Sequence, residues 1–387
     1  MHYLDHACFG PPAPRTQRAV LEALNELTSV VHRDATELAL EWLRQRDRAR
    51  SAVASLLGST SADVTLVEST THGMGIVAGG LQLRPGDNVV VGDCDFIGLP
   101  TVWRAQERRG IELRAATSER GRFSLDAIRQ VVDARTRVLA FSAVQEVSGV
   151  PLDVDGVAEI AASVRAYLLL DGIQEAGVVA REPARHGVHA YASGGHKWLR
   201  SPYGIGFLWT SPSLRAALTP PFQGYFAMTP PDGGWRAHLS DPTKTSLEPV
   251  DLRGDGAALE LGGTPNWPGA VGLGEAVGGL LEQGPRAVEL RARTLADRLR
   301  EELLSRGIAP MTPVGAPSPI VTFSLSPAVS DNDVVTRAQA AGIRVSARGS
   351  AGAQGVRVSC HGDNTDADIE ALLEVVDNFR EGSLTRR

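Results

Sequence analysis

The feature of this sequence that most constrains its fold is an alternation of strand-like and helix-like segments between residues 64 and 170. Short apolar runs occur at 65–67, 88–91, 111–115, 138–142 and 167–170, and segments with helical spacing separate them. Strands that are separated by helices pair in parallel and leave helices on both faces of their sheet. We therefore expect an α/β protein with a mostly parallel sheet.

The remainder of the chain predicts a second, smaller domain. Residues 3–14 are Pro-rich and cannot form a helix. Residues 210–262 are irregular and rich in Pro, Gly and Asp, as in a lid or an excursion to a dimer contact. Helical spacing also occurs at 15–28, 36–57, 269–281, 288–304, 331–341 and 366–379, and short strands are expected near 320–325, 343–345 and 356–359. We predict a large domain at 15–284 and a small α+β domain formed by 1–14 with 285–387.

Composition argues against several classes of function. The chain has 387 residues and a net charge of −6, which argues against a nucleic-acid partner. The three cysteines, Cys8, Cys94 and Cys360, form no pair motif and no zinc spacing, which suits a reducing compartment. No apolar run is long enough to span a bilayer, and the N-terminus lacks the features of a secretory signal. We expect a cytoplasmic protein without a membrane, nucleic-acid or metal partner.

Lys197 lies in a setting that is unusual for a surface lysine. It follows Gly194-Gly195-His196 and precedes Trp198-Leu199, at a glycine-rich turn between two apolar runs. Burial lowers the pKa of an amine and makes its neutral, nucleophilic form accessible, and such amines form Schiff bases with carbonyl compounds. A Gly-Gly-x-Lys turn also occurs without a function, so this motif alone leaves both interpretations open.

Hydroxyl groups follow the first predicted strand. Thr70 and Thr71 come shortly after the run at 65–67 and open a helix. The carboxyl ends of parallel strands are where α/β proteins bind ligands, and a helix N-terminus favours an anion such as phosphate. Ser and Thr also cap helices routinely, so plain capping is the alternative.

Two further strands are followed by polar residues. Gln145 follows the run at 138–142, and Asp171 comes directly after the four apolar residues 167–170, with Gln174 three positions later. A carboxylate in such a position is costly to desolvate unless a cation faces it. Asp171 is therefore either part of a functional site or one half of a buried structural ion pair.

One cofactor accounts for these features together. Pyridoxal phosphate needs an amine for its aldehyde, a carboxylate that keeps its pyridine nitrogen protonated, and an anion site for its phosphate. Lys197, Asp171 and the Thr70-Thr71 pair match these three needs. With its nitrogen protonated, the ring accepts the electrons of a carbanion at the substrate Cα.

The motifs resemble those of fold-type I enzymes of the class V aminotransferase family, in the same order and over nearly the whole chain. That family includes cysteine desulfurases, isopenicillin-N-epimerase-like proteins, kynureninases and C–S lyases. Residues 195–199 (GHKWL) resemble the lysine motif of the family, and residues 171–174 (DGIQ) resemble its Asp-x-x-Gln motif. The resemblance implies a large domain with a mostly parallel seven-stranded sheet sandwiched by helices, and a smaller C-terminal α+β domain.

The resemblance also implies roles for individual residues. Lys197 would form the Schiff base, Asp171 would hold the pyridine nitrogen, and Thr264, within 263–266 (GTPN), would reach the phosphate of a partner subunit's cofactor. This last role implies a homodimer. Arg357 would bind the carboxylate of an amino-acid substrate, for which a guanidinium is well suited. The implied catalytic residues are Lys197 and Asp171, and the implied cofactor-binding residues are Thr70, Thr71, Phe96, Gln145, Asp171, Gln174, Ser193, His196, Lys197 and Thr264.

The chain departs from the family pattern at three places. Residues 344–355 contain no cysteine, whereas cysteine desulfurases carry a sulfur-accepting cysteine in this region, so persulfide chemistry is not expected. Gly194 stands where many members have a phosphate-binding serine, and Ser193 is the candidate substitute. His72 replaces a glutamate that is common after the threonine pair. The roles of His6, Cys8, His72, Tyr225 and Trp235 stay open.

The resemblance implies a pyridoxal-phosphate enzyme that acts on an amino acid through a quinonoid at Cα. Phe96 and the missing acceptor cysteine favour β-elimination, that is, a C–S lyase that converts a cysteine S-conjugate to a thiol, pyruvate and ammonia. An epimerase, an aminotransferase and a decarboxylating oxidative deaminase share this chemistry and are the alternatives. A non-catalytic protein on the same scaffold is disfavoured because Lys197, Asp171 and Arg357 occur together.

Overall fold

A computed structural model describes residues 1–249 and 251–384, and its centre is a seven-stranded sheet. The strands follow the spatial order β2-β8-β7-β6-β5-β3-β4. β8 is antiparallel to both of its neighbours, and the other six strands share one direction. Their bounds are β2 (Val64–Val67), β3 (Asn88–Gly92), β4 (Glu112–Ala116), β5 (Thr136–Ser142), β6 (Tyr167–Asp171), β7 (Ala190–Gly194) and β8 (Gly206–Thr210). The expected α/β fold with a mostly parallel seven-stranded sheet is confirmed.

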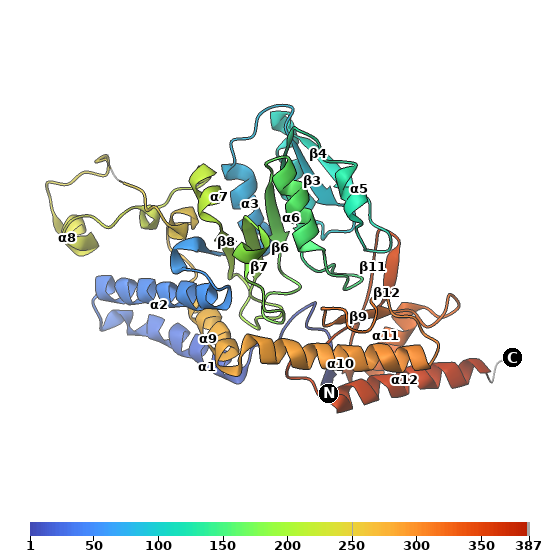
Figure 1. The fold of residues 1–387 in the computed structure, drawn as a ribbon. Coiled ribbons are helices and arrows are strands. Elements are labelled where there is room, and N and C mark those ends of the chain that lie inside the picture. The colour runs from blue at the N-terminus through green and yellow to red at the C-terminus, as the bar shows by residue number, and fades with distance from the viewer. Residues whose placement is uncertain (250, 385–387) are drawn as a thin grey trace.

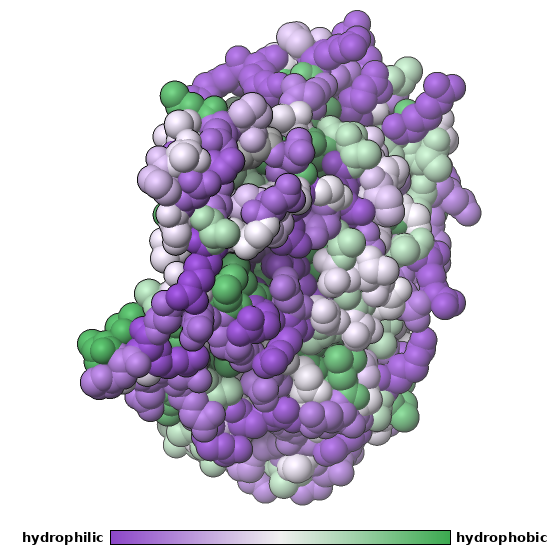
Figure 2. All heavy atoms as spheres, turned by 90° about the vertical axis from the view of Figure 1, so that its left-hand side faces the viewer, coloured by the Kyte–Doolittle hydropathy of each residue, from purple (hydrophilic) through white to green (hydrophobic). Residues whose placement is uncertain are grey.

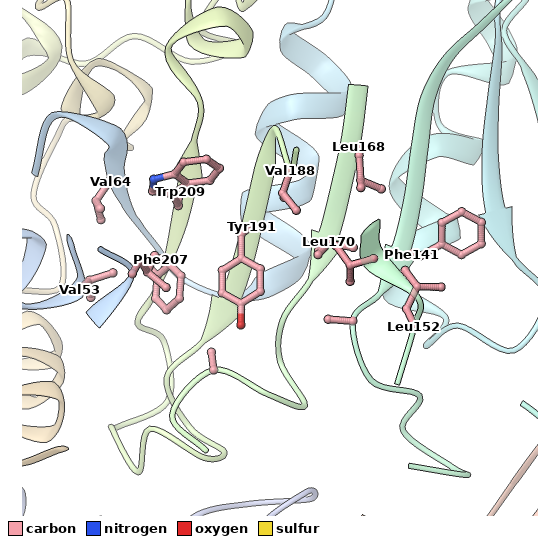
Figure 3. Packing of buried hydrophobic residues seen from close by; sticks show 14 of the residues in the cluster. Val53, Val64, Phe141, Leu152, Leu168, Leu170, Val188, Tyr191, Phe207 and Trp209 are labelled. Atoms are coloured by element: carbon pink, nitrogen blue, oxygen red, sulfur yellow. The ribbon is translucent and has the colours of Figure 1, made fainter. Parts of the chain in front are cut away.

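Helices cover both faces of this sheet, because successive strand residues point to opposite sides. In β6, Leu168 and Leu170 pack toward one face and Leu169 packs toward the other. Figure 3 shows the first of these layers, in which Tyr191 and Phe207 of neighbouring strands lie side by side. This face is covered by α2 (Ala35–Leu56), α5 (Leu125–Arg129), α6 (Val154–Ser163) and α9 (Trp267–Gln283), and the other by α3 (Thr70–Gly80), α4 (Gly98–Arg104) and α7 (Pro212–Ala217).

The shared strand direction gathers the polar residues at one edge of the sheet. The residues that follow β2, β3, β5, β6 and β7 all leave the sheet at its carboxyl edge, where ligands bind in folds of this kind. In Figure 1 the loops after β6 and β7 lie below the sheet, on the side of α9 and α10. The sheet therefore positions the predicted site residues without help from sequence proximity.

The C-terminal region forms its own small sheets against three helices. β9 (Ile320–Phe323), β12 (Ala353–Ser359) and β11 (Ser346–Ser350) form an antiparallel sheet, and β1 (His2–Tyr3) pairs in parallel with β10 (Ile343–Arg344). The helices are α10 (Pro285–Ser305), α11 (Asp331–Ala340) and α12 (Asp366–Leu384). The predicted boundary at residue 284 falls at the junction of α9 and α10, and it stays a prediction, as does the grouping of 1–14 with 285–387, of which 385–387 lie outside the described residues.

The predicted elements differ from the structure mainly where the chain is rich in small residues. Residues 346–350, for which no strand was expected, form β11 in a tight hairpin whose turn residues Ala351 and Gly352 have φ values of 45° and 75°. Ser, Ala and Gly carry little strand signal, so the hairpin depends on pairing with β12. The helix expected at 100–109 ends at Arg104 and continues as a short 3₁₀ turn.

The segment between β8 and α9 projects from the body of the protein. It carries the short helix α8 (Gly234–Ser240), which Figure 1 shows far from the sheet, beyond the ends of α1 (Pro14–Glu26) and α2. Leu239 and Leu247 on this excursion are 74% and 91% exposed. Across the described part of the chain, no helix combines the length and the apolar character needed to cross a membrane.

Candidate active site

Lys197 lies in a tight turn between β7 and β8. The Gly195 amide donates to the Ile205 carbonyl oxygen (2.8 Å), and the Arg200 amide donates to the Lys197 carbonyl oxygen (3.0 Å). Burial, and next the charge of Arg357, lower the pKa of the Lys197 amine, whereas Glu146 and Asp171 oppose this shift. The predicted setting of this lysine is therefore present, since its neutral form is favoured by its surroundings.

The N-terminal segment lies directly on the lysine turn. The Gly10 amide donates to the His196 carbonyl oxygen (2.9 Å), and a Cβ atom on Gly10 would lie 1.8 Å from the Lys197 carbonyl oxygen. The Tyr203 ring stacks on both His196 and Phe9, with centroid distances of 4.6 and 5.1 Å. Only a glycine permits this approach, so Gly10 fixes the N-terminal segment against Lys197.

Asp171 ends β6 and is almost fully buried. One of its carboxylate oxygens accepts a hydrogen bond from the Ile173 amide (2.9 Å). Burial raises the pKa of Asp171 to about 7; the Ile173 amide and Lys197 oppose this shift, and the nearby Asp95 adds to it. Asp171 and Lys197 thus influence each other across the carboxyl edge of the sheet, as expected if they serve one site.

Asp95 is a buried carboxylate that joins the ends of two strands. It accepts hydrogen bonds from the Gly92 amide (2.9 Å), the Ser142 amide (2.9 Å) and the side-chain amide of Gln145 (3.0 Å). The Gln145 carbonyl oxygen in turn accepts from the Cys94 thiol (3.2 Å). Gln145 therefore lies at the predicted edge, and within this structure its amide holds the β3 and β5 loops together.

The N-terminus of α3 lies beside the lysine strand. The Gly194 amide donates to the Thr70 hydroxyl (2.9 Å), and the Ser69 hydroxyl caps the helix by accepting from the His72 amide (3.1 Å). This cap leaves the amides of the first two helical residues, Thr70 and Thr71, available to an anion. Both interpretations of the hydroxyl cluster thus apply at once, because Ser69 caps and the threonines stay available.

Thr71 and Phe96 lie on the outer side of the site. A Cβ atom on Gly98 would lie 2.7 Å from the Thr71 hydroxyl, so the loop that carries Phe96 approaches the start of α3 closely. The Phe96 ring is 48% exposed. An exposed ring face near a helix N-terminus is suited to stack on a flat aromatic ligand whose phosphate binds to the helix.

The prediction for Ser193 is wrong. Ser193 is fully buried, and its hydroxyl donates to the Gly194 carbonyl oxygen (3.0 Å). Its neighbour Ala192 points to α3, where the Ala192 Cβ would lie 3.1 Å from a Cβ atom on Gly73. Strand alternation therefore turns Ser193 to the opposite face of β7, and it cannot replace a serine that binds a phosphate at α3.

Gln174 and His196 line the lysine turn and have partners of their own. The Gln174 side chain donates to the Ala7 carbonyl oxygen (3.0 Å) and accepts from the Trp198 indole (3.0 Å). His196 is half-buried against Tyr203, and burial and the Lys197 charge lower its pKa to about 4. A neutral imidazole and a clamped amide both hold the turn in place.

Arg357 approaches the site from β12 and is fully buried. It donates to the Glu146 carbonyl oxygen (2.9 Å) and to the Asp5 carboxylate (3.3 Å), while its Nε atom has no hydrogen-bond partner among the described residues. The Asp5 carboxylate also accepts from the Ser346 hydroxyl (3.0 Å). A ligand carboxylate that reached Arg357 would use Nε and would compete with Asp5 for the guanidinium.

Thr264 lies apart from the residues described so far. It is exposed and lines a cavity of about 440 Å³, together with His72, Asn266 and Phe222. Neither Lys197 nor Asp171 lines this cavity. The structure of a single chain therefore does not bring Thr264 to the lysine, which is the arrangement expected of a residue that serves a neighbouring subunit.

Sequence reasoning missed three acidic residues of the site. Asp5, Asp95 and Glu146 influence Arg357, Asp171 or Lys197 through their charges. Asp95 carried the same signal as Asp171, a carboxylate shortly after an apolar strand, and could have been found. Asp5 carried none, because its partner Arg357 is 352 positions away.

The comparisons with known proteins agree with the family resemblance. The family described as aminotransferase class-V matches residues 2–372. The chain is 27% identical over 310 residues to a protein described as a probable cysteine desulfurase from Methanothermobacter thermautotrophicus, which covers 78% of this chain and 72% of the relative. It is 28% identical over 274 residues to the isopenicillin N epimerase of Streptomyces clavuligerus, which covers 69% and 65%.

A solved structure shows the same fold. The cystine C–S lyase C-DES, in complex with its reaction product cysteine persulfide, superposes with a TM-score of 0.86 at 19% identity, covering 97% of each chain. At this identity the likeness concerns the fold alone. It agrees with the two-part α/β arrangement described above.

The raised pKa of Asp171 makes stability depend on pH in the cofactor-free protein. An unfolded aspartate titrates near pH ~3.9, so ionisation of the buried carboxyl costs free energy between about pH 4 and pH 7. Stability relative to Asp171→Asn should therefore fall as pH rises through this window and stay low above it. At pH 8 we expect Asp171→Asn to be more stable by about 2–4 kcal/mol, measured by urea unfolding. A difference that does not change between pH 4 and pH 8 would contradict the assignment.

Gly10→Ala should loosen the N-terminal segment from the lysine turn. The added Cβ would overlap the Lys197 carbonyl oxygen, so we expect a loss of about 1–3 kcal/mol in the free energy of unfolding. We also expect faster proteolysis of the N-terminal segment. Gly278→Ala on α9 is the matched control, because its Cβ would meet no atom within 4 Å. Equal unfolding curves for the two variants would show that the contact at Gly10 is unimportant.

Proposed function

Because the chain belongs to the class V aminotransferase family, whose enzymes depend on pyridoxal phosphate, we propose that it is a lyase that cleaves the C–S bond of a cysteine S-conjugate by β-elimination. The observation that carries the choice of reaction is the β11–β12 hairpin. Its strands pair without interruption from Ser346–Arg357 to Ser350–Ala353, and it contains no thiol. A short hairpin of this kind offers no loop cysteine to receive sulfur, so the sulfur would leave together with its substituent.

The residues at the carboxyl edge fit the cofactor. The free amides of Thr70 and Thr71 would hold its phosphate, Phe96 would cover its ring, and Asp171 would face its pyridine nitrogen. Gly194 leaves this edge open beside Thr70, since a side chain there would meet the His196 ring at 3.0 Å. When bound, pyridoxal phosphate supplies an aldehyde for amines and a ring that takes up electrons from bonds at Cα. A cation at the ring nitrogen would also return the Asp171 carboxylate to its ionised form.

The protein's own groups then account for the proton transfers. The Lys197 amine, whose pKa is lowered by burial, would first hold the aldehyde and then, once displaced by the substrate amine, remove the proton at the substrate Cα. Arg357 would hold the substrate carboxylate and so orient the Cα–H bond toward Lys197. The C–S bond at Cβ would break with both electrons going to sulfur.

The names of the relatives support this reaction class. A curated relative is described as a cysteine desulfurase and a structural neighbour as a cystine C–S lyase, and both descriptions concern cleavage of a C–S bond. The isopenicillin N epimerase keeps epimerisation as an alternative, alongside transamination and decarboxylating oxidative deamination.

Cys8 favours a second candidate, a cysteine desulfurase with a relocated acceptor. Its thiol is exposed, and its charge acts on Lys197, so it lies near the site. If Cys8 received the sulfur of free cysteine, the products would be alanine and a persulfide on Cys8. Elimination instead gives pyruvate, ammonia and a free thiol.

Product analysis separates these reactions. With S-conjugates of cysteine we expect pyruvate and thiol in equal amounts, and turnover lower by at least about 10³-fold in Lys197→Ala, because the base is lost. Absorbance of the bound cofactor in the visible range should change in Lys197→Ala, and Cys8→Ser should retain pyruvate formation. Alanine as the main product, with a persulfide on Cys8 by mass spectrometry, would establish the desulfurase instead. Loss of stereochemistry at Cα without pyruvate would establish an epimerase.

We further propose that the active form is a homodimer in which Thr264 completes the partner's phosphate site. Apolar side chains are exposed along α1 and the turn that follows it, with Leu21 and Val31 at 60% and 74% exposure. The excursion with α8 lies on the same side, and Figure 2 shows hydrophobic groups on this otherwise hydrophilic face. Surfaces of this kind are usually covered by another chain.

Intersubunit complementation tests this arrangement. Lys197→Ala and Thr264→Val each damage one site component, so homodimers of either variant should have little activity at limiting cofactor. A hybrid dimer, isolated with two affinity tags, would contain one doubly damaged site and one intact site. We expect it to recover about half of the wild-type activity per dimer. A hybrid as inactive as its parents would place Thr264 in the same site as Lys197 of its own chain.

A further inference from the structure

Arg348 is a half-buried guanidinium that lacks an acidic partner. It lies on β11, where Nη1 donates to the Ala347 carbonyl oxygen (3.1 Å) and Nη2 lies 3.5 Å from the Cys8 sulfur. In the described part of the chain no carboxylate lies within salt-bridge distance of it. Arginines of this kind are normally paired, so a guanidinium left with a thiol and a carbonyl oxygen is available to an anion.

Arg348 and Arg357 lie on the same face of one hairpin. Ser346 pairs with Arg357, and Arg348 pairs with Gly355. Paired residues share a face, as do residues two apart on one strand, so the two arginines are diagonal neighbours about 7–8 Å apart along the backbone. A carboxylate bound at Arg357 would therefore lie close to Arg348.

The position opposite Arg348 carries no side chain. Gly355 fills it, and a Cβ atom there would lie 2.7 Å from the Phe323 carbonyl oxygen. The close packing of the β12 backbone on β9 thus requires glycine at 355. As a consequence, no side chain of β12 competes for the Arg348 guanidinium, and the space beside it stays open on that strand.

Electrostatic contacts place Arg348 within the candidate site. The charge of Arg348 lowers the pKa of the Arg357 guanidinium, after the larger effects of burial and Asp5. Cys8, which contacts Arg348, also acts on Lys197. The chain Lys197, Cys8, Arg348 and Arg357 therefore surrounds one space rather than two separate sites.

We propose that Arg348 binds a second anionic group, located at the far end of the substrate's side chain. This inference rests on the proposed function and narrows its substrate class to cysteine S-conjugates whose sulfur substituent ends in a carboxylate or a similar anion. An extended chain advances about 1.2 Å per bond, so five or six bonds separate two carboxylates that bind to neighbouring guanidiniums about 7 Å apart. S-carboxymethyl-L-cysteine has this length, and its amide, S-carbamoylmethyl-L-cysteine, is a neutral compound of the same shape.

The first test compares these two compounds as substrates. We expect the wild-type enzyme to prefer the carboxylate over the amide by about 10–100-fold in kcat/KM, mainly through KM, because a charge-assisted hydrogen bond is lost with the amide. In Arg348→Gln the preference should fall to about one, and Arg348→Lys should restore part of it. Arg344→Gln removes an exposed arginine from the adjacent strand β10 and is the matched control, which should keep the preference.

The second test uses Cys8 as a reporter that needs no turnover. Cys8 is exposed and the other two cysteines are buried, so carbamidomethylation by iodoacetamide should label Cys8 first. In Lys197→Ala protein, S-carboxymethyl-L-cysteine should slow this labelling several-fold more than its amide does. The difference should vanish in the Lys197→Ala, Arg348→Gln double variant.

The outcomes separate this inference from the proposed function. Pyruvate formation from both compounds at equal efficiency, with equal protection of Cys8, would overturn the anion subsite and leave the lyase intact. A preference that Arg348→Gln does not change would assign it to another group and also overturn the inference. Failure of every S-conjugate to give pyruvate or to alter the cofactor absorbance would remove the proposed function, and the subsite with it.

Discussion

A carboxylate and an amine that are buried at the same edge of a sheet set the main constraint on this structure. Burial raises the pKa of Asp171 and lowers that of Lys197, so each charge is costly alone and each is made tolerable by the other. Their approach requires β6 and β7 to run in the same direction, and it requires a turn that returns the chain to β8 directly after the lysine. The strand order and the glycine-rich turn thus serve one electrostatic arrangement.

The two ends of the chain close the site that the sheet leaves open. The Ser359 amide donates to the Leu4 carbonyl oxygen, and the Gly10 amide donates to His196, so the N-terminal segment bridges the C-terminal sheet and the lysine turn. Asp5 lies on this bridge and shares its carboxylate between Ser346 and Arg357. A substrate that competes with Asp5 for Arg357 would therefore act on the bridge itself, which links ligand binding to the packing of the chain ends.

Sequence patterns predicted the parts of the molecule that local rules determine. The strands of the main sheet, the helix at Thr70 and the positions of Lys197 and Asp171 follow from apolar periodicity and from the residues next to strand ends. Ser193 was misplaced because neighbouring positions on a strand face opposite sides, so a substitute one residue away points to the wrong face. β11 and the contacts of Asp5 were missed because they depend on pairing between segments distant in the sequence.

The hairpin β11–β12 connects the proposed reaction to the proposed choice of substrate. If no thiol of this hairpin receives the sulfur, the sulfur leaves with whatever is bonded to it, and the site must then accommodate that substituent. The substituent of a substrate anchored at Arg357 extends along the face of the hairpin that carries Arg348. The same exchange of a loop for a tight hairpin would thus remove a sulfur acceptor and supply a cation for the leaving group, and a thiolate that carries its own anion gains most from that cation.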